Sequence, residues 1–469
     1  MLNCSGNPVV ETNVAAKRAS GAAWRGELAA LLTLGLPMAA TQLVQFSVMT
    51  VDVLMIGRLG PDPLAASAIG VVIFFAAWLV GFGPAMAVSP LVSQALGAND
   101  RDYDDVRISV RMALWAIAAL TPLMFIGFAL AEPIMLALGQ PANLAAAAGP
   151  YVLALGPGWA FAMGVICLRN FLAAIGETRA PLVIVIGTTL LNAFLNWLLI
   201  YGHWGFPRLE LVGAGIASSI VNFFGFTGLV VYIRSDARAK TFHLFREFLT
   251  PHWERLREIA RLGWPIGVTI AFEGMLFNAC VFVMGKIGVN EVAAYQVALN
   301  VASIAFMGPL GLSMAGGVRV GLAAGACDWP RVRRAAALTV AISVATIMLV
   351  ALPTMLAPQF VAGLYLNSDD PANTAVISLV AKFLVIAGAF MFFDAVQVAC
   401  AQALRGLKDV RWPMVITGIS YWVIGFPVAA WLGLRTATGA VGVWWGLLAG
   451  LFCAAAMLAT RLHLLTRRR

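Results

Sequence analysis

The sequence contains twelve long apolar runs, each of roughly 20 residues or more. A helix needs about 20 apolar residues to cross the ~30 Å hydrocarbon core of a bilayer. The runs are continuous and do not alternate with polar residues, which favours helices over a β-barrel. We therefore predict an all-α polytopic membrane protein with 12 transmembrane helices. The predicted spans are about 28–56, 64–96, 109–130, 147–175, 181–201, 210–233, 259–284, 291–322, 335–357, 376–404, 412–432 and 438–460.

The composition excludes most water-soluble classes of protein. Hydrophobic residues make up 61% of the chain and charged residues 11%, whereas a soluble domain has about 25% charged residues. A folded surface in water needs more polar groups than this chain can supply. The composition therefore argues against a cytosolic enzyme and against a nucleic-acid partner, and it makes the lipid bilayer the expected surroundings.

The distribution of basic residues predicts the orientation in the membrane. If the N-terminus is cytoplasmic, most of the 31 Lys and Arg residues fall in inner segments. An excess of Lys and Arg marks the cytoplasmic side of a membrane protein. Arg319 is ambiguous, because it lies within the eighth predicted span. With an even number of spans, we expect both termini to be cytoplasmic.

The sequence also resembles itself at an offset of 228 residues. Leu34-Gly35-Leu36-Pro37-Met38 returns as Leu262-Gly263-Trp264-Pro265-Ile266, and Gly57-Arg58-Leu59-Gly60 returns as Gly285-Lys286-Ile287-Gly288. Apolar residues match by chance in such a chain, but Gly and Pro matched in one register do not. The repeat predicts two pseudo-symmetric six-helix bundles.

These bundles divide the chain into five parts. Each half has an even number of spans, so the halves should share one topology, with an axis along the membrane normal and a cavity between them. That plan suits a transporter and is a weak expectation for an enzyme. Within the linker, apolar residues from Phe242 to Leu249 predict an amphipathic helix on the inner leaflet. The predicted parts are a cytoplasmic tail (1–27), an N-terminal bundle (28–233), a cytoplasmic linker (234–258), a C-terminal bundle (259–460) and a basic tail (461–469).

Three carboxylates, those of Asp52, Glu273 and Asp394, fall inside apolar runs. An ionised carboxylate at bilayer depth costs at least about 2.5–3.5 kcal/mol on insertion scales. Each must therefore face a wet cavity, pair with a cation or hold a proton. All three outcomes predict a coupling site that binds H⁺, Na⁺ or a cationic substrate in turn. The alternative is structural: Asp52 is hydrogen-bonded at a helix end, and Glu273 and Asp394 are bonded to other helices.

Uncharged polar residues form a second group of candidates within the spans. Asn192 and Asn196 are one helical turn apart and share a face. Their alternative role is hydrogen bonding between helices. Pro37 and Pro265 occupy matched positions and predict helix kinks. The supporting polar candidates are Asn192, Asn196, Gln42, Gln45, Tyr295, Gln296 and Asn300.

Several motifs, taken together, resemble the multidrug and toxic compound extrusion (MATE) family over residues 28 to about 460. The paired Gly-x-Pro helix starts are among them, and the presence of both Glu273 and Asp394 resembles the NorM-type bacterial branch. The remaining motifs are Val51-Asp52 followed by Gly57, Pro90 to Ala98, Phe272-Glu273, Tyr295 to Asn300, and Asp394 to Gln397 leading to Leu404-Arg405-Gly406.

The resemblance implies a V-shaped pair of bundles that exports organic cations and amphipathic drugs by antiport with Na⁺ or H⁺. Glu273 and Asp394 would occupy the cation-binding positions and would ligate Na⁺ if the protein is sodium-coupled. Asp52, Asn192 and Asn196 would match a polar cluster of the N-terminal half. Tyr295 stands where many members have His. The resemblance further implies a bacterial inner-membrane protein, which we expect to be a monomer without a cofactor other than the coupling ion.

Two other functions have requirements that the sequence does not meet. A lipid-linked oligosaccharide flippase of the same superfamily would need a cationic cavity for pyrophosphate, whereas the spans here carry acids and almost no Lys or Arg. A membrane prenyltransferase would need two acidic clusters in cytoplasmic loops. The sequence has one, at residues 100–105, which is better explained as a solvated loop.

Overall fold

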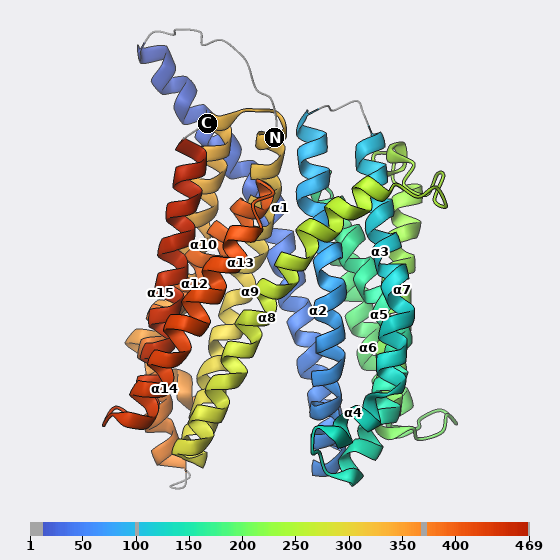
Figure 1. Cartoon of the computed structure of the whole chain (residues 1–469), viewed down its shortest axis with the longest axis vertical. Coiled ribbons are helices and arrows are strands. Elements are labelled where there is room, and N and C mark those ends of the chain that lie inside the picture. Colours follow the sequence, from blue (N-terminus) through green and yellow to red (C-terminus); the bar gives the residue numbers. More distant parts are fainter. Residues whose placement is uncertain (1–12, 99–102, 367–372, 468–469) are drawn as a thin grey trace. The chain divides into compact units, whose positions relative to one another are not determined.

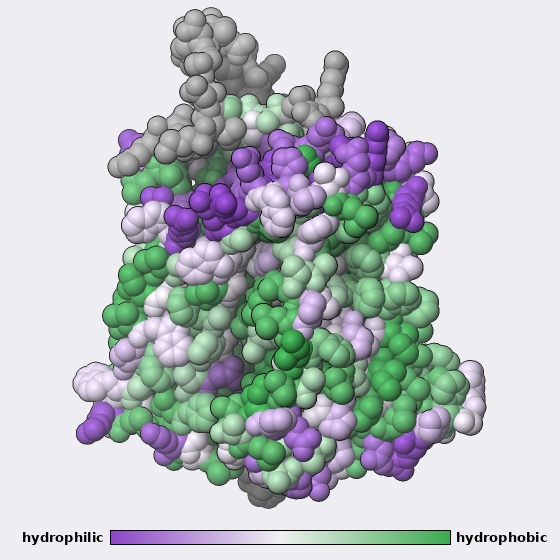
Figure 2. Space-filling model, turned by 45° about the vertical axis from the view of Figure 1, so that its right-hand side comes forward, coloured by the Kyte–Doolittle hydropathy of each residue, from purple (hydrophilic) through white to green (hydrophobic). Residues whose placement is uncertain are grey.

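The computed structural model describes residues 13–98, 103–366 and 373–467. Within these ranges every regular element is helical, and twelve helices are long and apolar enough to cross a membrane. The predicted all-α class and the predicted number of spans are therefore confirmed. Figure 2 shows hydrophobic residues along the sides of the helices and hydrophilic residues gathered at their ends. Residues 1–12 and 468–469 of the two predicted tails lie outside the described part of the chain.

The chain divides into two compact units. We call residues 40–267 the N-terminal unit, and residues 1–39 together with 268–469 the C-terminal unit. The boundaries fall inside α1 (Asn13–Gly57) and α8 (Trp253–Ile287). Each of these two helices therefore belongs to one unit over its first part and to the other over its second part.

Pro37 and Pro265 mark these transitions. Pro37 lies inside α1, two residues before Ala39, where α1 passes from the C-terminal to the N-terminal unit. Pro265 lies inside α8, two residues before Gly267, where α8 passes from the N-terminal to the C-terminal unit. A proline within a helix removes one backbone hydrogen bond and loosens the helix at that point. The halves predicted from the sequence divide at the linker instead. The prediction therefore placed the first part of α1 in the N-terminal half and the first part of α8 in the C-terminal half, whereas the compact units have the reverse.

In the N-terminal unit, α5 is the central helix and packs against α2, α3, α4 and α7 (Figure 1). Tyr201 near the end of α6 donates a hydrogen bond from its hydroxyl to the carbonyl oxygen of Met55, at 2.8 Å, which ties α6 to α1. The elements that belong to this unit alone are α2 (Pro61–Ala98), α3 (Asp104–Ala129), α4 (Ala131–Ala137), α5 (Ala142–Ala174), α6 (Arg179–Tyr201), α7 (Glu210–Ser235) and the short 3₁₀ helix η1 (Ala239–Phe242).

In the C-terminal unit, α12 is central and packs against α9, α10, α11 and α15. The eleventh span, Arg411–Arg435, is continuous but not uniform, because its middle is a π-helical segment. Such segments are rare and often occur at functional sites. The elements of this unit are α9 (Val289–Gly325), α10 (Trp329–Leu356), α11 (Pro358–Gly363), α12 (Thr374–Gly406), α13 (Arg411–Gly418), η3 (Ile419–Gly425), α14 (Phe426–Arg435) and α15 (Ala440–Arg467).

The order of elements repeats between the units. In each, the third span is followed by a short helix, α4 after α3 and α11 after α10. The first residues of these short helices, Ala131 and Pro358, are separated by almost the same offset as the sequence repeat. In each unit the fourth span, α5 or α12, is also the central one. This order agrees with two pseudo-symmetric six-helix bundles.

A buried ion network holds the first part of α1 to α9 within the C-terminal unit. The Glu27 carboxylate, which is 6% exposed, accepts two hydrogen bonds of 2.7 Å from the Arg319 guanidinium. Arg331 on α10 approaches the same carboxylate at 3.3 Å. A bidentate guanidinium–carboxylate pair of this kind is a strong, directional contact. Arg319, ambiguous in the sequence, therefore has a structural partner that the sequence did not reveal.

The prediction of an amphipathic helix in the linker is wrong. After the 3₁₀ turn η1, residues 243–252 form turns and irregular structure. Phe242 is buried, and its ring packs against those of Tyr103 and Phe171, at centroid distances of 4.4 and 5.4 Å. Part of the apolar surface that was predicted to contact the inner leaflet is thus buried against the N-terminal unit.

The acidic loop at residues 100–105 lies partly outside the described residues, which resume at Tyr103. Asp104 pairs with Arg107 at 2.9 Å, and Asp105 pairs with Arg255 at 2.5 Å. Both carboxylates are more than half exposed. These pairs agree with a solvated loop.

Candidate functional site

The C-terminal unit brings two of the predicted carboxylates into one electrostatic cluster. Glu273 lies on the second part of α8, and Asp394 lies near the middle of α12. Asp394 is 8% exposed, and its Oδ1 atom is buried without a hydrogen-bond partner among the described residues. The charge of Glu273 acts on Asp394, so the two groups are close enough to influence each other. A buried carboxylate oxygen without a donor is a position where a cation or a proton would be stabilised.

Arg405 and Tyr421 complete this cluster, and neither was predicted from the sequence to be a site residue. Arg405 lies eleven residues after Asp394 on α12, close to three helical turns, so both lie on one face of the helix. Glu273 interacts electrostatically with Arg405. The Tyr421 hydroxyl is buried without a hydrogen-bond partner in that same part, and both carboxylates act on it.

The π-helical segment η3 helps to position Glu273. Trp422 donates a hydrogen bond from Nε1 to the carbonyl oxygen of Phe272, at 3.3 Å. Gly418, just before η3, packs against the ring of Phe272, and a Cβ at Gly418 would lie 3.0 Å from that ring. The residue next to Glu273 is thus fixed from one side by a backbone contact and from the other by close packing.

The charges of the cluster do not balance. Two carboxylates and one guanidinium carry a net charge of about −1 when all are ionised. A buried uncompensated charge is unfavourable, because burial removes it from water without supplying a counter-charge. One further positive charge would balance the cluster. A proton, Na⁺ or the ammonium group of an organic cation could each supply it.

The N-terminal unit holds a separate polar cluster around Asp52. The Oδ1 atom of Asp52 accepts two hydrogen bonds of 2.6 Å, from the side-chain amide nitrogens of Asn192 and Asn196. Both asparagines are at most 1% exposed, and they share one face of α6, as their spacing predicted. Tyr151 of α5, which the sequence did not single out, lies within electrostatic range of Asp52.

This second cluster also has unused acceptors. The Oδ1 atoms of Asn192 and Asn196 are buried and have no hydrogen-bond partner in the described residues. If the amide groups rotated, their oxygens would join the Asp52 carboxylate as ligands for a hard cation, which prefers several oxygens. In the observed orientation the amides instead stabilise the negative charge of Asp52.

Gln42 and Gln45 lie in the same unit near a basic side chain. Gln42 accepts a hydrogen bond of 3.0 Å from Arg169 of α5. Gln45 and Arg169 line a cavity of about 170 Å³, together with residues of α6 and α7 such as Thr189 and Asn222. Of the described residues that line this cavity, Arg169 alone is charged.

The structure does not bring together the three predicted polar residues that begin α9. Tyr295 is fully buried, donates a hydrogen bond to the carbonyl oxygen of Phe277 at 3.3 Å, and packs against Trp444. Gln296 is exposed, and so is Asn300, whose side-chain oxygen accepts a hydrogen bond from Tyr365. Adjacent positions on a helix point about 100° apart, so Tyr295 is buried in the core while Gln296 is exposed.

Two bundles of long apolar helices, each with a buried carboxylate cluster, define a polytopic membrane protein of the transporter class. Comparison with known proteins identifies the family. The MatE family model matches residues 37–198 and 265–431, and the chain belongs to this family of transporters.

Relatives and solved structures agree with this assignment. The chain is 40% identical over 447 residues to a probable multidrug resistance protein NorM of Rhizobium meliloti, covering 95% of each chain. It is 37% identical over 449 residues to a probable multidrug resistance protein NorM of Mesorhizobium japonicum, covering 95% of this chain and 96% of the relative. The fold matches a crystal structure of the eukaryotic MATE transporter AtDTX14, with a TM-score of 0.83, 22% identity, and coverage of 94% and 96%.

Proposed function

We propose that this protein is a secondary active multidrug efflux transporter, which exports organic cations and amphipathic drugs in exchange for Na⁺ or H⁺. The observation that carries the proposal is the unpartnered, buried Asp394 carboxylate beside Glu273. The names of the NorM relatives support the substrate class. An apolar surround with a few convergent polar groups is also typical of sites that bind amphipathic ligands.

The proposed mechanism is competition for the negative charge of the Glu273–Asp394 cluster. A hydrophobic cation enters from the cytosol or the inner leaflet and displaces the bound proton or Na⁺. An external cation then returns and expels the drug. A ligand shifts a conformational equilibrium only by its differential affinity for the two states. Exchange at one charge therefore couples the two movements without any chemical step.

Asp52 offers a second place for the coupling ion. Its carboxylate, with Asn192 and Asn196, could bind the ion in the N-terminal unit while the drug binds at Glu273 and Asp394. In that arrangement the drug and the ion bind at different sites, and each weakens binding of the other by favouring a different conformation of the protein. Substituting Asp52 and Asp394 separately, and measuring ion binding for each variant, would distinguish the two arrangements.

The proposed location is the bacterial inner membrane, with both termini cytoplasmic. The support for this orientation is the excess of Lys and Arg in the segments that it places inside. The linker between α7 and α8 lies on that side, together with its basic residues.

The test of the proposed function uses purified protein in sealed lipid vesicles loaded with a fluorescent organic cation. We expect an inward Na⁺ or proton gradient, imposed without ATP, to drive dye out, and collapse of the gradient to stop it. Applying the two gradients separately identifies the coupling ion. Dye efflux that is independent of both gradients, or absent for every cationic dye tested, would reject the proposal.

The flippase alternative has little support. It requires a cationic cavity, whereas the described lining of the cavity in the N-terminal unit contains one charged residue, Arg169. The C-terminal cluster has more acidic than basic groups.

A further inference from the structure

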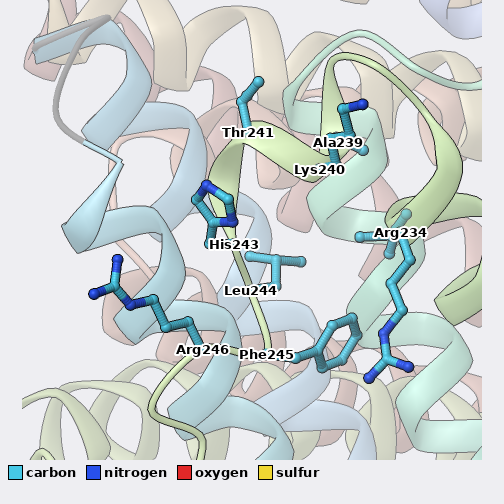
Figure 3. A pocket seen from close by; sticks show the side chains of 9 residues that line it. Arg234, Ala239, Lys240, Thr241, His243, Leu244, Phe245 and Arg246 are labelled. Atoms are coloured by element: carbon cyan, nitrogen blue, oxygen red, sulfur yellow. The ribbon is translucent and has the colours of Figure 1, made fainter.

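The linker between α7 and α8 forms a hollow that the transport mechanism does not use. Its volume is about 410 Å³, and its lining extends from the end of α7 to Arg246 (Figure 3). The floor is apolar: Ile233, Ala239 and Leu244 are buried, and Phe245 is half-buried. The rim is exposed and basic, formed by Arg234, Lys240, His243 and Arg246.

Fixed contacts hold the segment that forms the hollow near both of its ends. Arg111 and Trp115, both on α3, donate hydrogen bonds to the carbonyl oxygens of Glu247 and Phe248, at 2.7 and 2.8 Å. At the other end, the Asp236 carboxylate accepts hydrogen bonds from the backbone N–H groups of Arg238 and Ala239. The hollow is therefore formed before any ligand binds, so little conformational entropy is lost on binding.

The positive charge of the rim is largely uncompensated. Among the described residues, no acidic side chain lines the hollow. Asp236 is engaged with the backbone, and Glu247 meets Arg246 at 3.6 Å, with both side chains more than half exposed. Exposed ion pairs of this kind are weak, because solvent screens their attraction. Arg234 lies with its guanidinium 4.9 Å from the centre of the Phe245 ring, which orients it and leaves its edge free for an anion.

The position of the hollow indicates the ligand. It begins at Ile233 and Arg234 in the last turn of α7. Because α7 is long and apolar enough to cross a membrane, its end is expected where the chain leaves the hydrocarbon core. Figure 3 shows the side chains of Arg234 and Arg246 on either side of Leu244 in that view. A basic rim above an apolar floor, at this depth, complements a molecule with a phosphate next to an acyl chain. Basic residues at the cytoplasmic surface also face the leaflet that carries anionic lipid.

We infer that this hollow binds an anionic phospholipid of the inner leaflet. The phosphate contacts Arg234, Lys240 and Arg246, and the glycerol and upper acyl chain cover Leu244 and Phe245. The site is independent of the drug and ion sites, although its assignment to the inner leaflet rests on the proposed orientation.

Native mass spectrometry of the full-length protein in detergent tests this inference, with phosphatidylglycerol as the anionic lipid and phosphatidylcholine as the zwitterionic control. We expect the unmodified protein to retain phosphatidylglycerol preferentially. A basic residue near an anionic lipid surface contributes about 1 kcal/mol. Replacing Arg234, Lys240 and Arg246 together with Gln should therefore weaken phosphatidylglycerol binding on the order of 100-fold.

The matched control replaces Arg179, Arg257 and Arg261 with Gln. These exposed residues lie near the N-terminal ends of α6 and α8, on the same proposed side of the membrane as the linker, and outside the hollow. We expect this variant to bind phosphatidylglycerol as the unmodified protein does. Equal losses in both triple variants, or no preference for phosphatidylglycerol over phosphatidylcholine, would overturn the inference. Millimolar inorganic phosphate separates the two sources of the anion. Complete displacement of the lipid by phosphate alone would identify a soluble-anion site instead.

Discussion

Replacing Asp394 with Asn is expected to reduce ion-driven drug efflux on the order of 100-fold or more. A bound cation would lose its desolvated charge partner, which costs about 2–5 kcal/mol of binding free energy. Each 1.4 kcal/mol is a factor of ten in affinity. Asn has nearly the shape of Asp, and the Oδ1 atom of Asp394 has no hydrogen bond to lose among the described residues. We therefore expect the variant to fold and insert normally, and gradient-driven dye efflux from vesicles measures the loss.

Glu291→Gln is the control for this substitution, because Glu291 lies in the first turn of α9 in the same unit and outside the cluster. It should transport normally. Glu273→Gln should also abolish transport, but it should lower the stability of the protein as well, because Arg405 then loses its electrostatic partner. Normal efflux by both Asp394→Asn and Glu273→Gln would contradict the mechanism.

The second large effect concerns Glu27, whose carboxylate binds Arg319 and Arg331. Replacing Glu27 with Ala should reduce the free energy of unfolding by about 3–5 kcal/mol, because a buried guanidinium would be left without a counter-charge. Arg319 is 14% exposed, so water cannot compensate fully. Thermal unfolding of the detergent-solubilised protein, followed by intrinsic fluorescence, measures the change.

A double variant separates the ion pair from simple packing. Glu27→Ala combined with Arg319→Leu removes both charges and should recover a large part of the lost stability, as in other replacements of buried ion pairs by apolar residues. Glu210→Ala is the matched control, since Glu210 and its partner Arg208 are 54% and 60% exposed. It should change stability by at most about 1 kcal/mol. If Glu27→Ala were no more destabilising than this control, the network would have no structural role.

Much of the fold could be predicted from the sequence because the bilayer imposes a simple rule. Twelve apolar runs of spanning length can become only helices, and all twelve are present. The repeat predicted two similar bundles, because Gly and Pro are placed by backbone geometry and not by hydrophobicity. The face shared by Asn192 and Asn196 followed from their four-residue spacing, and both meet Asp52.

Other features depended on contacts between distant segments. Glu27 and Arg319 are 292 residues apart, and no local pattern relates them. The place of Tyr421 in the site could not be predicted, because it lies in a π-helical segment, which cannot be recognised from the periodicity of the sequence. Arg405 could have been found, since its distance of eleven residues from Asp394 places both on one helical face. The linker prediction failed because apolar residues such as Phe242 pack equally well on a leaflet or on a neighbouring helix.

The central claim is that drug and coupling ion compete for the negative charge around Asp394. Titrating an organic cation into purified protein, while recording proton release in weak buffer and displacement of radioactive Na⁺, tests it most directly. We predict that drug binding releases one of these ions, and that Asp394→Asn abolishes the release. Saturable drug binding that releases neither ion, with the same affinity in the unmodified protein and in Asp394→Asn, would contradict the claim.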